Sequence, residues 1–215
     1  MKKNILWLLG VCATLSLCFS SCSKDTESVD PYSNWDTRNV TYIDSIAAVC
    51  KNAPAGEDWS SHLNYKLQDG NAIGSLGTQW AISDYVYMKR LPYNPDGVEP
   101  ELGSYPRSNN DTVMVYYRGR LINGTVFDQN YTGTWNPKIA EPTAFTLSGV
   151  ITGLETALWY MREGERAELY IPSDLGYGAS SMSDIPANST LIFDVRVEKI
   201  VHATGPDDRM KEVLE

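Results

Sequence analysis

Apolar residues follow a helical period in the first part of the chain. They recur about one turn apart, at Ile43, Ile46, Ala47 and Cys50. Spacings of three and four residues place side chains on one helix face. The pattern therefore predicts an amphipathic helix between Trp35 and Cys50, closed by Pro54 and Gly56. Residues 52–83 show no clear period, and we expect only loops and short turns there.

From Tyr85 onward, apolar residues alternate with polar ones. A strand is expected at 85–91, and the inward positions of three later strands are Val113, Val115 and Tyr117, then Ala167, Leu169 and Ile171, then Leu191, Phe193, Val195 and Val197. A period of two is typical of strands that bury one face and expose the other. We therefore predict half-buried strands.

One short helix interrupts these strands. Thr152 and Glu155 have the spacing of a capping box, and Gly164 is expected to end the helix. The predicted buried stripe is Leu154, Ala157, Leu158 and Met161. This order of elements predicts an α+β fold, an antiparallel β-sheet wrapped around one short α-helix, with an N-terminal helical extension.

The N-terminus has the features of an export signal. Lys2 and Lys3 precede an apolar run from Ile5 to Phe19. The run is too short for a comfortable membrane span, so we interpret residues 1–21 as a signal peptide.

Cys22 is the expected lipidation site, because it follows two serines at the end of the apolar run, as in bacterial lipoproteins. The alternative is an ordinary signal peptide cut near Ser21, with Cys22 left as a thiol. The polar, acidic residues 23–33 suit a flexible tether. These features predict a protein of the bacterial cell envelope, at the outer membrane on its periplasmic or surface face, which touches the membrane only through its lipid.

Charge and cysteine content narrow the partners. Loss of residues 1–21 changes the net charge from −9 to −11, because two lysines and no acidic residue are removed. This charge argues against nucleic acid as a partner. With Cys22 lipidated, Cys50 is the one remaining thiol, so no internal disulfide is expected.

Residues 85–202 contain no metal-binding set, P-loop or nucleophile triad. His62 and His202 each stand alone in the sequence, which is more typical of a surface or hydrogen-bonded histidine than of a ligand. Chemistry that needs a strong base or nucleophile is therefore disfavoured, and no metal or cofactor is expected.

Three segments carry a family resemblance. They are YYRGRLINGTVFD (116–128), VITGLETALWYMREGERAELYIPSDLGYG (150–178) and IPANSTLIFDVRVEKI (185–200). In this order they resemble the FKBP-type peptidyl-prolyl cis/trans isomerases. The resemblance implies rotation of X-Pro bonds in proline-containing polypeptides, and binding of macrocycles related to tacrolimus and rapamycin.

The resemblance also implies a set of pocket residues. They are Tyr117, Phe127, Asp128, Phe145, Val150, Ile151, Leu154, Tyr177, Ile185 and Phe193. The implied roles are a substrate carbonyl held by the Ile151 N–H, a second one held by the Tyr177 hydroxyl, and polar groups oriented by Asp128. Ile185 is expected at the rim.

Two departures from the family pattern bear on activity. The pocket floor is Leu154 where active members commonly have tryptophan, and an aromatic wall position is Thr143. The loop from Gln129 to Glu141 is also longer than in the minimal domain. Its Trp135 is expected either to cover the pocket or to be a surface aromatic.

The sequence thus predicts an isomerase domain at 85–202, after a signal peptide (1–21), a tether (22–33) and an extension (34–84), and before a tail (203–215). The function that follows is isomerisation in the folding of exported envelope proteins. Two alternatives remain open: a peptide-binding or chaperone module of the same fold with weak or no turnover, and a structural surface lipoprotein.

Overall fold

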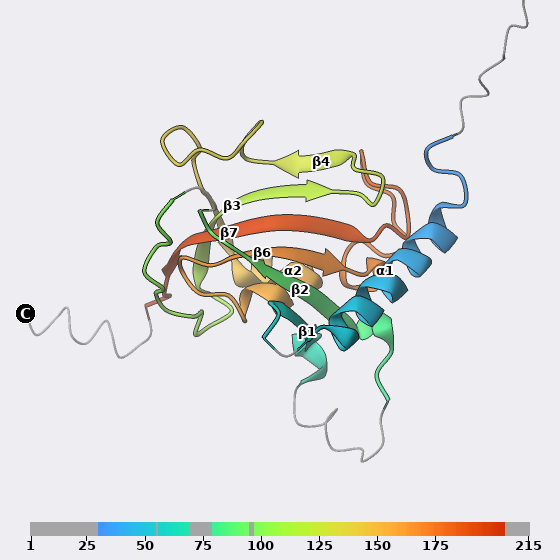
Figure 1. Cartoon of the computed structure of the whole chain (residues 1–215), viewed down its shortest axis with the longest axis horizontal. Coiled ribbons are helices and arrows are strands. Elements are labelled where there is room, and N and C mark those ends of the chain that lie inside the picture. The colour runs from blue at the N-terminus through green and yellow to red at the C-terminus, as the bar shows by residue number, and fades with distance from the viewer. Residues whose placement is uncertain (1–29, 55, 69–78, 95–96, 205–215) are drawn as a thin grey trace, which may run out of the picture. The chain divides into compact units, whose positions relative to one another are not determined.

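The computed structural model describes residues 30–54, 56–68, 79–94 and 97–204. Its folded unit begins at Pro31. The signal peptide, Cys22 and most of the tether lie outside the described residues. Figure 1 shows the helices α1 (Trp35–Asn52) and α2 (Thr152–Leu158), and the strands β1 (Trp59–Leu63), β2 (Tyr85–Leu91), β3 (Thr112–Arg120), β4 (Val126–Gln129), β5 (Thr143–Thr146), β6 (Arg166–Ile171) and β7 (Leu191–Val201). Single-turn 3-10 helices are η1 (Tyr65–Leu67), η2 (Ile82–Asp84), η3 (Leu147–Gly149) and η4 (Ser173–Leu175).

The strands form one antiparallel sheet in the order β1-β2-β6-β7-β3-β4, and β5 also pairs with β3. Because β4 and β5 pair with different parts of β3, the loop between them leaves the sheet edge (Figure 1). The antiparallel α+β prediction is confirmed. Strand β1 was not predicted, since the sequence WSSHL has apolar residues only at its ends. It pairs with β2, so one sheet contains residues on both sides of position 84, where the N-terminal extension was predicted to end.

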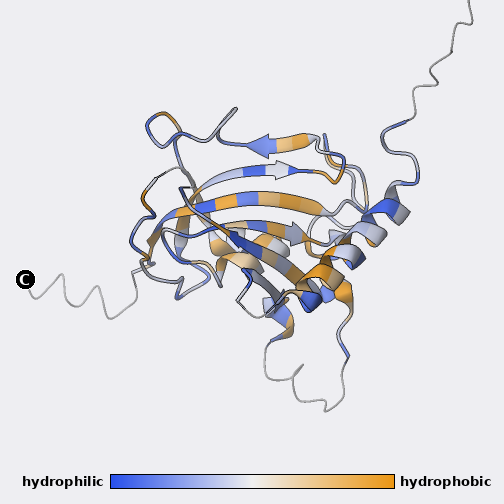
Figure 2. Cartoon of the chain, viewed as in Figure 1, coloured by the Kyte–Doolittle hydropathy of each residue, from blue (hydrophilic) through white to orange (hydrophobic). Residues whose placement is uncertain are grey.

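The main core lies between the sheet and α2. The predicted inward residues of β3, β6 and β7 belong to it, and Leu154, Ala157, Leu158 and Met161 pack against them. Figure 2 shows that the central strand β7 is largely apolar, as expected for a strand with neighbours on both edges. Gly153 permits the close approach of α2, because a Cβ there would lie 2.2 Å from Ile171 Cγ2.

Part of the opposite face of the sheet is also covered, so the prediction of half-buried strands is wrong at Tyr87, Tyr170 and Ile192. A second cluster is formed by Ile43 of α1 with Tyr87, Tyr170 and Ile192, which alternate with core residues along their strands. The amphipathic helix predicted between Trp35 and Cys50 is confirmed as α1, with its Ile43, Ile46, Ala47 and Cys50 stripe facing this cluster. Tyrosines at the outward positions of these strands are therefore buried rather than exposed to solvent.

The predicted cap and end of α2 are wrong. The N-cap is Ile151 and no side chain caps it, so Thr152 is already the first helical residue. The hydroxyl oxygen of Thr152 instead accepts a hydrogen bond of 2.9 Å from Lys66 Nζ. The helix ends at Leu158, well before Gly164, which has a φ of 80° in the following turn.

Trp135 neither covers the pocket nor lies free on the surface. Its ring centroid is 5.4 Å from that of Tyr93 and 5.5 Å from that of Tyr116, and the Arg196 guanidinium lies 4.5 Å above it. Tyr116 and Tyr117 are neighbours on β3, so their side chains point to opposite faces of the sheet. Trp135 therefore packs on the face away from Tyr117.

Candidate functional site

A cavity of about 630 Å³ lies between the sheet and α2. All ten residues implied by the resemblance line it, from Tyr117 to Phe193 along the chain. The structure adds Gly149 and residues 182–184 to its wall. The binding roles of these residues remain predictions, but the fold brings all of them together.

The polar side of the cavity is a tyrosine and carboxylate pair. The Tyr117 hydroxyl donates a hydrogen bond of 2.8 Å to Oδ2 of Asp128. Burial raises the pKa of Tyr117, and the hydrogen bond to Asp128 raises it further, so this hydroxyl stays protonated. Asp128 itself is exposed and lines the cavity.

Aromatic rings form two walls. Phe145 meets Tyr117 edge to face, with centroids 5.5 Å apart, and Phe127 meets Phe193 in the same way at 5.4 Å. This geometry is the one that aromatic pairs prefer. Gly119 makes room for the second pair, because a Cβ there would lie 2.5 Å from Phe127 Cζ and 2.9 Å from Phe193 Cε1.

The start of α2 supplies the floor of the cavity and one hydrogen-bond donor. Leu154 is 8% exposed and belongs to the main core. The Ile151 backbone N–H, at the helix N-cap, makes no hydrogen bond within the described part of the chain. The first amides of a helix have no partner inside it. Ile151 therefore offers a donor to a ligand carbonyl at the cavity wall.

The remaining wall is a short turn between Met182 and Ile185. The two residues exchange backbone hydrogen bonds of 2.9 and 3.2 Å. Ile185 was expected at the rim, and it is 6% exposed and lines the wall. Tyr177 also lines the cavity and is 36% exposed.

Asn130 is a positioning residue that the sequence did not reveal. Its Oδ1 accepts a hydrogen bond of 2.9 Å from the Tyr117 N–H, and its Nδ2 donates to Val115 O at 2.8 Å and to Thr143 Oγ1 at 3.0 Å. It therefore joins β3 to the strand that carries Phe145. Only its place directly after the Phe-Asp-Gln strand could have suggested this role. Thr143 is half-buried, its hydroxyl oxygen accepts the hydrogen bond from Asn130, and it is not among the residues that line the cavity.

The histidines lie outside the cavity and each has a partner. His62 shares a hydrogen bond of 2.9 Å with Ser60, and His202 one of 2.8 Å with Asp111. In the described ranges no group of three or more His, Cys, Asp or Glu side chains could hold a metal ion. No helix among these residues is long and apolar enough to cross a bilayer.

The cavity is therefore apolar over most of its wall, with two carboxylates, two tyrosines and one available amide. Nothing in it is arranged as a nucleophile with a base. Such a site suits a ligand with a compact apolar ring and carbonyl groups beside it. It can exclude water and hold carbonyls without breaking a bond.

Comparison with known proteins identifies the same region. Residues 104–198 match the family model described as FKBP-type peptidyl-prolyl cis-trans isomerase. The isomerase FkpA of Escherichia coli (strain K12) is 40% identical over 110 residues, which are 51% of this chain and 38% of FkpA. The isomerase Mip of Coxiella burnetii is 44% identical over 89 residues, 41% of this chain and 36% of Mip. The chain thus spans less than half the length of these curated relatives.

Solved structures agree on the fold. The crystal structure of FkpA from Escherichia coli has a TM-score of 0.52 at 26% identity and covers 80% of this chain and 63% of that one. The crystal structure of a peptidyl-prolyl cis-trans isomerase from Pseudomonas syringae has a TM-score of 0.51 at 26% identity. The match covers 78% of this chain and 96% of that one. Residues 104–198 therefore form a domain of the FKBP-type peptidyl-prolyl cis-trans isomerase family.

Proposed function

We propose that this chain catalyses cis/trans isomerisation of X-Pro bonds in exported polypeptides, and that residues 85–202 form the catalytic domain. One observation supports this most directly. The ten pocket residues line a single cavity of about 630 Å³, and the unpartnered Ile151 N–H lies at its wall.

The reaction needs no covalent chemistry. The amide barrier of about 18–20 kcal/mol arises from resonance between nitrogen and carbonyl. An apolar cavity withdraws water from the carbonyl and thereby disfavours the charge-separated planar form. A wall that fits the twisted amide better than either planar isomer lowers the barrier further.

In this proposal the prolyl ring sits on Leu154 among the aromatic walls. The Ile151 N–H donates to one substrate carbonyl and the Tyr177 hydroxyl to another. Asp128 holds the Tyr117 hydroxyl through the 2.8 Å hydrogen bond, which orients that ring against Phe145. Macrocycles related to tacrolimus and rapamycin would use the same cavity.

A protease-free isomerisation assay on a short aminoacyl-prolyl peptide tests the activity. Asp128→Ala should lower kcat/KM about tenfold or more, because it removes the hydrogen bond that orients the Tyr117 ring in the cavity, and a small misplacement at a site can cost up to about a hundredfold. Asp174→Asn is the matched control, because Asp174 is also an exposed carboxylate but does not line the cavity. Equal activity in the two variants would contradict the assigned site.

A second candidate function is binding of proline-containing peptides with little turnover. Leu154 favours it, because leucine lacks the broad flat surface on which a prolyl ring packs. A folded wild type that binds the peptide but does not accelerate its isomerisation would establish this candidate. The scaffold alternative predicts neither binding nor turnover.

We further propose that Cys22 carries the lipid and that residues 23–33 tether the domain to the bacterial outer membrane. Support comes from the apolar run and the two serines before Cys22. Cys22→Ala should abolish palmitate labelling and move the protein from the detergent phase to the aqueous phase. Unchanged labelling would refute the anchor and leave the isomerase proposal intact.

A further inference from the structure

A second hollow adjoins the cavity across the turn at 182–185. Its volume is about 520 Å³, and it is lined by Tyr32, Thr125, Val126 and residues 181–186. Residues 182–185 line both spaces. A polypeptide that leaves the first cavity over this turn would therefore enter the second hollow.

The N-terminal segment supplies one wall of this hollow and is held firmly in place. Tyr32 packs edge to face on Trp35, with centroids 5.1 Å apart. Trp35 is 6% exposed, and its Nε1 donates a hydrogen bond of 2.9 Å to Ser189 Oγ. Asn39 adds a buried acceptor for the Thr190 N–H at 2.7 Å. Helix α1 is thus fixed to the segment that directly follows the shared turn.

Exposed apolar side chains surround the hollow. Val126 is 43% exposed, Met182 51% and Tyr32 36%. A grouping of large exposed apolar residues at a concave surface is typical of a contact site. Because this group continues from the first cavity, its natural occupant is more of the same polypeptide.

The charged side chains that line the cavity and the second hollow are all acidic. Asp128 and Asp184 are the charged residues among those that line them, and no Lys or Arg of the described chain does so. Asp184 is exposed and forms no ion pair with a described residue. The nearby Arg38 is engaged elsewhere, since it donates to Pro31 O at 2.7 Å and lies over the Trp35 ring.

We propose that the second hollow binds the stretch of substrate that flanks the X-Pro bond, and that it favours an apolar side chain together with a Lys or Arg. Tyr32, Val126 and Met182 contact the apolar side chain, and Asp184 attracts the cation. An extended chain covers about 3.3–3.6 Å per residue, so a few flanking residues suffice to reach the hollow. This inference rests on the proposed function, since the same polypeptide occupies both spaces.

The experiment compares three peptides with the same central X-Pro bond. The first is short. The second is extended by about four residues at each end, including Leu and Lys, which is enough chain to cross the turn. The third has Glu in place of Lys. The measured quantity is the ratio of kcat/KM for each long peptide to that for the short one.

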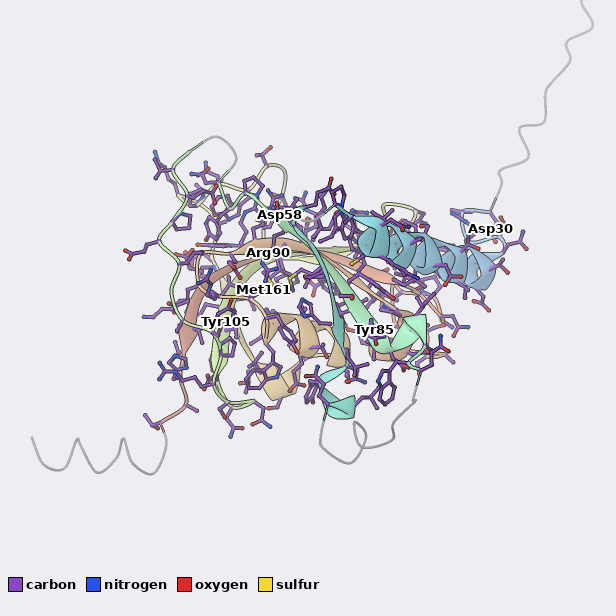
Figure 3. The ribbon with its side chains drawn as sticks, turned by 60° about the horizontal axis from the view of Figure 1, so that its bottom comes forward. Asp30, Asp58, Tyr85, Arg90, Tyr105 and Met161 are labelled. Atoms are coloured by element: carbon purple, nitrogen blue, oxygen red, sulfur yellow. The ribbon has the colours of Figure 1, made fainter. Side chains whose placement is uncertain are left out.

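For the wild type we expect the Lys peptide to exceed the Glu peptide about two- to fivefold, as for an exposed ion pair. Added salt should reduce this difference. Asp184→Asn should abolish it, and Tyr32→Ala should lower the ratio of long to short about two- to tenfold, the range of an aromatic contact. The matched controls Asp174→Asn and Tyr105→Ala should keep the wild-type ratios. Figure 3 shows Tyr105 at the end of the folded unit away from α1.

The outcomes separate the two proposals. If the short peptide is turned over but all three peptides behave alike, or if the variants match their controls, the second hollow is not a substrate site. If the wild type turns over no peptide, the proposed function fails. Fluorescence anisotropy with the labelled Lys peptide then tests whether the second hollow binds the peptide. Weaker binding by Asp184→Asn and Tyr32→Ala supports this proposal, and unchanged binding overturns it.

Discussion

The imidazole of His62 stacks on the ring of Tyr160, with centroids 3.9 Å apart and an interplanar angle of 21°. His62 lies in β1, and Tyr160 follows α2 almost a hundred residues later. The contact therefore joins β1, which precedes the region that matches the family model, to a residue within 104–198. Burial, together with the positive charge of Arg90, lowers the pKa of His62 to about 4.

This pKa predicts a loss of stability in mild acid. The folded pKa lies below the ordinary histidine value of 6.5, so the contribution of His62 to stability is complete above pH 6.5 and is lost as the pH falls toward 4. Because the side chain is partly exposed, we expect a loss of about 2 kcal/mol. Urea unfolding of wild type and His62→Gln at pH 7.5 and 4.5 measures it. The variant should lose less stability between the two pH values, and an identical loss would show that His62 is not the titrating group.

Pocket residues should differ from core residues in their effect on stability. Asp128 and Tyr177 are exposed, so Asp128→Ala and Tyr177→Phe should change the free energy of unfolding by roughly 0.5 kcal/mol or less. Phe193 is 6% exposed and packs in the main core, so Phe193→Ala should cost about 3–5 kcal/mol. Thermal melts of the three variants give the comparison. Equal destabilisation by all three would mean that the cleft assignment is wrong.

Enlarging the floor should improve the pocket. Leu154→Trp adds an aromatic surface where the prolyl ring is proposed to sit, and the gain should be about 0.5–1.5 kcal/mol, or tenfold at the upper end. The readouts are the isomerisation rate and the affinity for a rapamycin-like macrocycle. Circular dichroism and a thermal melt check folding, since Leu154 also belongs to the core. A folded variant with no gain in either readout would contradict the placement of the proline.

Gly119 offers an independent test of the aromatic wall. A Cβ at this position would lie within 3 Å of Phe127 and Phe193, so Gly119→Ala should displace one ring into the cavity. We expect ligand affinity and turnover to fall about tenfold, with a loss of stability of about 1–3 kcal/mol from overpacking. Gly149→Ala is the matched control, because it also adds a methyl group to the cavity wall but displaces no ring, since its nearest side-chain atom, Thr146 Cβ, lies 3.9 Å from the added Cβ. Equal affinities in the two glycine variants would refute the proposed displacement.

Local sequence determined much of this protein. Alternation at Val113, Val115 and Tyr117 predicted an inward face, because successive side chains of a strand point to opposite sides. The helical stripe around Ile43 predicted α1, and the family resemblance implied ten residues that the fold places around one cavity. These signals depend on neighbouring residues or on spacing within a motif, so the linear order retains them.

Only the tertiary structure showed which distant segments of the chain pack against each other. Trp135 could not be placed from its loop, because its neighbours Tyr93 and Arg196 lie far away in the sequence. Likewise, Tyr32 reaches the pocket turn only because Trp35 and Asn39 bond to Ser189 and Thr190, more than 150 positions along the chain. Local periodicity reports which face of an element is apolar but not which distant segment covers it. That choice is made by side-chain packing and paired buried polar groups, which exist only once the chain has folded.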